Sequence, residues 1–114
     1  MKDDILREIV KFRDDRDWKQ FHSPKNVAMS IAIEASELME LFQWARDDET
    51  EQVVRDRRSE IEEEIADVAI FVHLFCHDLD IDLENAIRRK LETNAKKYPV
   101  DKAKGSSRKY NVDP

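Results

Sequence analysis

The chain has 114 residues, 40% apolar and 40% charged, and its 20 basic and 26 acidic side chains give a net charge of −6. This length and apolar content predict one globular domain, and the acidic balance argues against a general nucleic-acid binder. The single glycine, Gly105, excludes glycine-rich nucleotide loops of the Walker or Rossmann kind and disfavours tight hairpins, so we expect an all-α fold.

The N-terminus and the apolar runs predict where the protein works. Asp3 and Asp4 stand where a secretory signal would carry basic residues, and no apolar stretch follows them. No apolar run approaches the roughly 20 residues that span a bilayer. The lone Cys76 excludes an intrachain disulfide. We therefore expect a cytoplasmic protein with no membrane or nucleic-acid partner.

The spacing of apolar residues predicts four helices along the chain. Ser23 followed by Pro24 is typical of a helix start, because serine caps free amides and proline fits the first helical position. Asp82 is placed to cap the last helix, and Pro99 ends it. The predicted helices cover residues 3–17, 24–45, 51–79 and 83–97, with loops at 17–22 and 46–50, a domain boundary at residue 99 and a flexible polar tail over 100–114.

Four helices in a chain of this length predict a small four-helix bundle. Residues 65–75 are apolar around nearly the whole circumference of the third helix. Such a helix must be covered on every side, which so small a bundle does poorly. We therefore expect a homodimer or homotetramer with this stretch buried between subunits.

Four carboxylates stand among apolar residues. Glu34 and Glu37 share one face of the second predicted helix, and Glu64 and Asp67 share one face of the third, because each pair has i,i+3 spacing. An unpaired buried carboxylate is costly or becomes protonated, and a divalent cation removes that cost. Oxygen ligands select a hard ion, so the pattern predicts a Mg²⁺ site in which Mn²⁺ can substitute.

Two alternatives for these acids remain open from the residues alone. Lysine or arginine could pair with them inside the bundle, although residues 64–79 contain neither. A ferritin-like di-iron site would need Glu-x-x-His on two helices, but Ile70 and Leu74 stand three residues before His73 and His77. We expect these histidines in the core or in a subunit interface.

The order of these motifs resembles the MazG-like all-α nucleoside triphosphate pyrophosphohydrolases, and within them the branch that contains dCTP pyrophosphatase. The resemblance covers about residues 5–99. One departure is Ala35-Ser36 between the first two acids, where the family carries glycine, and this should not disturb a helical site. The resemblance rests on the two acidic pairs, on RDWKQFHSPKN at 16–26, on ELMELFQW at 37–44, and on the residues from Ile81 to Pro99.

The resemblance implies an enzyme of nucleotide metabolism that cleaves a nucleoside triphosphate between the α- and β-phosphates. The expected substrate is dCTP or a modified deoxynucleotide, the products are the monophosphate and pyrophosphate, and the expected role is house-cleaning of the nucleotide pool. The four acids would bind the metal and serve catalysis. The expected substrate-binding residues are Trp18, His22, Trp44 and Phe71 for the base, and Lys25, Asn26, Lys90, Asn94, Lys97 and Tyr98 for the phosphates.

Each of these residues also has a plainer interpretation. A lysine can belong to a solvated helix face, and an aromatic side chain can belong to the core. The alternative function for the whole chain is a non-catalytic helical module that binds nucleotides or takes part in an assembly.

Overall fold

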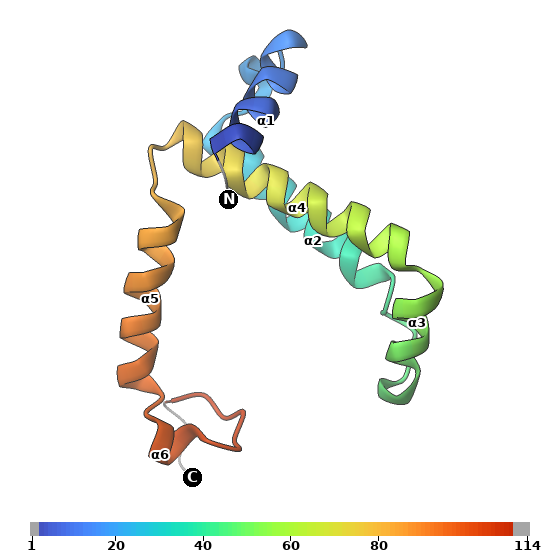
Figure 1. Ribbon diagram of the computed structural model, residues 1–114, viewed down its shortest axis with the longest axis vertical. Helices are drawn as coiled ribbons and strands as arrows, with labels where there is room; N and C mark the ends of the chain where they lie inside the picture. The colour runs from blue at the N-terminus through green and yellow to red at the C-terminus, as the bar shows by residue number, and fades with distance from the viewer. Residues whose placement is uncertain (1–2, 111–114) are drawn as a thin grey trace. The chain divides into compact units, whose positions relative to one another are not determined.

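A computed structural model describes residues 3–110, and every regular element in that range is helical (Figure 1). The all-α prediction is therefore confirmed. The chain forms two compact units, the first ending at Asp80 and the second beginning at Ile81. Every helix described is too short or too polar to span a lipid bilayer. The elements are α1 (Asp3–Asp15), η1 (Lys19–Phe21), α2 (Pro24–Glu40), η2 (Asp47–Glu49), α3 (Thr50–Asp56), α4 (Arg58–Asp78), α5 (Leu83–Lys97) and α6 (Val100–Ala103), where η denotes a 3-10 helix.

The first unit is built on the pairing of α2 with α4, which run antiparallel along much of their length (Figure 1). Val27 on α2 and Leu74 on α4 are buried in it, with 1% and 3% of their surface exposed. Helix α1 also packs against α4. Buried Arg13 fastens α1 to the end of α4, because its Nη1 and Nη2 donate to the two carboxylate oxygens of Asp78 at 2.7 and 2.9 Å.

Both predicted helix starts are confirmed. The Ser23 hydroxyl accepts a hydrogen bond from the Asn26 amide at 3.1 Å and caps α2, with Pro24 in the first turn. Asp82 caps α5 in the same way by accepting from the Asn85 amide at 3.1 Å. These caps set where α2 and α5 begin, and they thereby fix which residues of each helix share a face.

The structure differs from the prediction in three main places, besides shifts of one or two residues such as the end of α1 at Asp15 instead of residue 17. The helix expected over 51–79 is two helices, because Arg57 leaves helical geometry with φ −121° and ψ 29°. The surrounding charged stretch has no continuous apolar face that would hold one straight rod against the core. Helix α2 ends at Glu40 rather than near residue 45, since the next amides bond three residues back, as in Phe42 to Met39 at 3.0 Å.

The third difference lies in the segment expected to be a flexible tail. It contains the short helix α6 and a turn at Gly105. The last four residues of that predicted tail, 111–114, lie outside the described residues.

Candidate metal centre and adjoining cavity

The pairing of α2 with α4 brings the two predicted acidic pairs together. Glu34 and Glu37 come from α2, and Glu64 and Asp67 come from α4. One carboxylate oxygen from each of the four side chains lies within 4.8 Å of the others. The i,i+3 spacing places each pair on one helical face, and the antiparallel packing turns these two faces toward each other.

The four carboxylates repel one another, and this repulsion contributes to raised pKa values. Burial, then interaction with Glu37 and repulsion from Asp67 and Glu64, raises the pKa of Glu34 to about 7. Burial and the neighbouring Glu37 also raise the pKa of Glu64. Within residues 3–107, neither lysine nor arginine forms a salt bridge with any of the four. The internal ion pair considered from the sequence is therefore absent from this part of the chain.

Two oxygen atoms of the cluster are suited to bind a cation. Oε2 of Glu34 and Oε2 of Glu64 are buried and have no hydrogen-bond partner. A buried acceptor without a donor is costly, and a bound divalent ion satisfies it and neutralises the repulsion that raises both pKa values. A set of four carboxylates matches Mg²⁺ or Mn²⁺ by its ligand chemistry.

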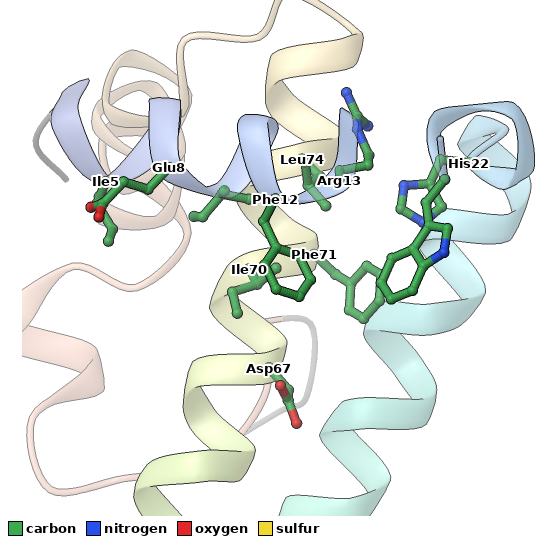
Figure 2. A pocket seen from close by; sticks show the side chains of 11 residues that line it. Ile5, Glu8, Phe12, Arg13, His22, Asp67, Ile70, Phe71 and Leu74 are labelled. Atoms are coloured by element: carbon green, nitrogen blue, oxygen red, sulfur yellow. The ribbon is translucent and has the colours of Figure 1, made fainter. Parts of the chain in front are cut away.

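An aromatic cavity adjoins the cluster (Figure 2). It has a volume of about 410 Å³, and three of the predicted base-binding residues, Trp18, His22 and Phe71, line it together with Asp67. The rings of His22 and Phe71 meet edge to face with centroids 6.1 Å apart. Asp67 thus belongs both to the acidic cluster and to the cavity wall. The cavity wall also includes Ile5, Glu8, Ile9, Phe12, Arg13, Ile70 and Leu74.

Helix α1 forms part of the cavity wall, which the sequence alone does not indicate. Phe12 stands edge to face against Trp18, with ring centroids 5.9 Å apart, and so completes an aromatic corner. The periodic apolar residues of α1 were visible as a helical face, but nothing in them indicated which helix that face would cover. The one local signal was the pair of aromatic residues at positions 12 and 18.

The surroundings of His22 disfavour its protonated form. Burial, followed by the positive charge of Arg13, lowers its pKa below the ordinary value for histidine. Its Nδ1 atom is buried and has no hydrogen-bond partner among the described residues. An uncharged imidazole with one free ring nitrogen can exchange a hydrogen bond with the polar edge of a bound ring.

Other predicted substrate residues lie apart from the cavity. Trp44, in the turn after α2, is 87% exposed and does not line it. Lys25 is exposed in the first turn of α2. The neighbouring Asn26 side chain donates to the Phe21 carbonyl at 3.0 Å and so ties α2 to the loop that carries Trp18 and His22.

The remaining predicted residues belong to the second unit. Lys90, Asn94 and Lys97 follow one another at spacings of four and three along α5, which places them on one face of that helix. Tyr98 ends the helix, and its amide donates to the Asn94 carbonyl at 2.8 Å.

Comparison with known proteins identifies the family of this chain. A model of the MazG-like family matches residues 29–112. The chain belongs to the MazG-like family. The match includes the acidic cluster and also most of the segment after α5. The resemblance inferred from the motifs is thereby confirmed.

Relatives and a solved structure agree with this membership. The chain is 38% identical over 110 residues to dCTP pyrophosphatase 1 of Bos taurus, covering 95% of this chain and 65% of that protein. It is 37% identical over 114 residues to dCTP pyrophosphatase 1 of Homo sapiens, covering 98% and 67%. A crystal structure of a pyrophosphatase from Archaeoglobus fulgidus is 46% identical and superposes with a TM-score of 0.83, covering 85% of this chain and 91% of that one. The chain therefore has the MazG-like pyrophosphatase fold and spans about two thirds of the length of its mammalian relatives.

Proposed function

We propose that this MazG-like chain is a magnesium-dependent nucleoside triphosphate pyrophosphohydrolase. It would hydrolyse the bond between the α- and β-phosphates of dCTP or a modified deoxynucleotide and release the monophosphate and pyrophosphate. The observation that carries the proposal is the set of four carboxylates within 4.8 Å, contiguous with an aromatic cavity through Asp67. The names of its relatives, dCTP pyrophosphatases and an archaeal pyrophosphatase, support both the reaction and the substrate class.

Glu34, Glu37, Glu64 and Asp67 are the proposed ligands for Mg²⁺. The bound ion would supply positive charge to the phosphate oxygens and favour in-line attack by water. The protein's own part is to hold the carboxylates in place before the ion arrives. Because the pKa of Glu34 is about 7, this carboxyl carries a proton through part of the neutral range and would release that proton on binding a cation.

The cavity is the proposed base site. Trp18, Phe71 and the neutral His22 line it, and they offer flat apolar surface together with one free ring nitrogen. Nucleobases have apolar faces and polar edges, so this combination suits them. Trp44 is proposed as a further stacking residue, and the only support for it is that it resembles one of the family's base-binding positions.

The phosphates are proposed to meet basic and amide side chains. Lys25 and Asn26 open α2, where free amides and the helix dipole favour anions. A second set lies along one face of α5 and at its end. These residues are Lys90, Asn94, Lys97 and Tyr98.

Pyrophosphate release from a nucleotide panel tests the proposal. The purified chain is assayed with each deoxynucleoside and ribonucleoside triphosphate in Mg²⁺, in Mn²⁺ and in EDTA, and we expect release only with metal and fastest with dCTP or a modified form. Glu64→Gln should abolish most of the activity, whereas Glu63→Gln, one residue earlier and exposed, should retain it. If no nucleotide yields pyrophosphate with either metal, the chain is instead a non-catalytic helical module, which calorimetric titration with the same nucleotides would reveal by binding without turnover.

We also propose that the protein works as a homodimer or homotetramer. Within residues 3–110, only two apolar residues, Val27 and Leu74, are almost fully buried, with 1% and 3% of their surface exposed. In contrast, Met29, Ile33 and Ile65 on the paired helices are 52%, 53% and 50% exposed. Apolar surface of this extent is typical of an interface between subunits. Sedimentation velocity at micromolar concentration checks this, and a monomer would contradict it.

A further inference from the structure

The segment that follows α5 folds back onto the end of that helix. Helix α6 begins directly after Pro99, and the Ser106 amide donates to the Ala103 carbonyl at 3.0 Å to close its last turn. Gly105 then takes φ +79°, a left-handed conformation that glycine adopts without a steric penalty. The chain reverses there and brings Tyr110 beside the residues that end α5.

Tyr110 touches two of these residues. The amine nitrogen of Lys97 lies over the Tyr110 ring, 4.8 Å from its centroid. The same ring meets the ring of Tyr98 edge to face, with centroids 5.9 Å apart and an interplanar angle of 85°. One aromatic side chain of the C-terminal segment therefore supports both Lys97 and Tyr98.

We propose that Tyr110 is a positioning residue that holds the Lys97 ammonium ready for the triphosphate. The proposal rests on the function proposed above, in which Lys97 and Tyr98 bind phosphate. It gives a role to a segment whose composition had suggested a flexible tail.

The physical reason lies in what an aromatic ring does to a lysine. A free lysine side chain samples many rotamers, and binding a phosphate with it costs that freedom. The face of an aromatic ring attracts the ammonium through the ring quadrupole, which restricts the rotamers beforehand. A carboxylate partner would restrict them too, but it would neutralise the charge that the phosphate needs. In the described chain no ion pair involves Lys97, so its charge stays available.

Two further observations favour a role in the enzyme over chance contact. The family match runs to residue 112, so the segment lies inside the region that defines this chain as MazG-like. The Tyr110 side chain is also 56% exposed, which means that little of the fold depends on burying it. A tyrosine that contributes little to the core has its main described contacts with two candidate substrate residues.

The test is a double-mutant cycle between Tyr110 and Lys97. Tyr110→Leu removes the ring, Tyr110→Phe keeps it, and Lys97→Met removes the ammonium. Val100→Ala is the matched control, because Val100 is 76% exposed in the same segment. For Tyr110→Leu we expect the KM for Mg²⁺-dCTP and the inhibition constant of inorganic pyrophosphate to rise about two- to five-fold, with kcat nearly unchanged. Tyr110→Phe should behave as the wild type, and Tyr110→Leu should have no further effect once Lys97 is methionine.

Three results would overturn the role of Tyr110: an unchanged KM in Tyr110→Leu, failure of phenylalanine to rescue, or an undiminished effect of Tyr110→Leu in the Lys97→Met background. A wild-type protein without turnover would instead contradict the proposed function. Calorimetric titration with the non-hydrolysable α,β-imido analogue of dCTP then decides the matter without catalysis. Weaker binding by Tyr110→Leu supports the positioning role, and equal or absent binding by both proteins overturns it.

Discussion

Replacing Glu34 by glutamine should stabilise the metal-free protein at pH 8, and Mg²⁺ should reduce this advantage over the wild type. In the folded protein the pKa of Glu34 is about 7, against 4.5 for an ordinary glutamate, so the folded state binds more protons than the unfolded state between these values. The free energy of unfolding therefore falls as the pH rises through that window and stays low above it. Glutamine carries no titrating charge, so the stability of the variant should not fall with pH for this reason.

The size of the effect follows from the pKa. The difference between about 7 and 4.5 corresponds to about 3.4 kcal/mol at most. Glu34 is partly exposed, and solvent screening reduces this figure, so we expect Glu34→Gln to add about 1–3 kcal/mol at pH 8 in EDTA. Near pH 5, where folded Glu34 is already protonated but unfolded Glu34 is still mostly ionised, the gain should fall to about a quarter of its value at pH 8. Saturating Mg²⁺ at one hundred times its dissociation constant would stabilise the wild type by about 2.7 kcal/mol, and the variant by less because it has lost a charged ligand.

Urea unfolding at fixed protein concentration measures these differences. Wild type and Glu34→Gln are compared at pH 5 and pH 8, in EDTA and in Mg²⁺, with Glu63→Gln as the control for loss of an exposed negative charge. The reasoning is refuted if Glu34→Gln is no more stable than the wild type at pH 8 in EDTA, if the same gain appears at pH 5, or if the control behaves alike.

Other predictions concern Asp67 and the buried pair of Arg13 with Asp78. Asp67→Asn should lower kcat/KM in Mg²⁺ by at least ~100-fold, since a charge contact to the transition state is lost, yet thermal unfolding in EDTA should show no loss of stability. Arg13→Met should lower the free energy of unfolding by about 2–4 kcal/mol, because it removes both hydrogen bonds to the Asp78 carboxylate, which is 12% exposed, and leaves it only Lys19 at 3.8 Å. Lys11→Met breaks only an exposed pair and should cost less than about 1 kcal/mol in the same urea titration. Arg13 lowers the pKa of Asp78, so the pair's contribution is present above about pH 4 and should fade as acid protonates Asp78.

The acidic cluster could be predicted because its signal is local. Each pair of acids shares a helical face by spacing alone, and the absence of lysine and arginine from 64–79 left few ways to compensate them. To predict that α2 and α4 pair, it was then enough to assume that their apolar faces are buried against each other. The structure joins all four carboxylates within 4.8 Å, in agreement with that prediction.

The cavity wall formed by α1 could not be predicted because its determinant is long-range. Arg13 and Asp78 stand 65 residues apart, and in a chain with 40% charged residues neither looks unusual. Only the fold shows that Arg13 is 2% exposed and doubly hydrogen bonded, while many similar arginines are in solvent. Composition was equally uninformative for the C-terminal segment, where the contact of Tyr110 with Lys97 depends on the turn at Gly105.

The order of residues along α4 explains why the proposed metal and base sites adjoin. Glu64, Asp67, Phe71 and Leu74 follow at spacings of three, four and three, so they form one stripe on one helical face. Along this stripe the character changes turn by turn from proposed metal ligand to cavity wall to buried core. A shift of α4 by a single turn, about 5.4 Å, would separate the carboxylates from those of α2 and move Phe71 away from His22. The register of α4 against α2 therefore governs both proposed sites together. The Arg13–Asp78 pair lies beyond the buried end of the stripe and holds α1 against the cavity. Its hydrogen bonds do not involve the four carboxylates, whose positions depend on the pairing of α2 with α4.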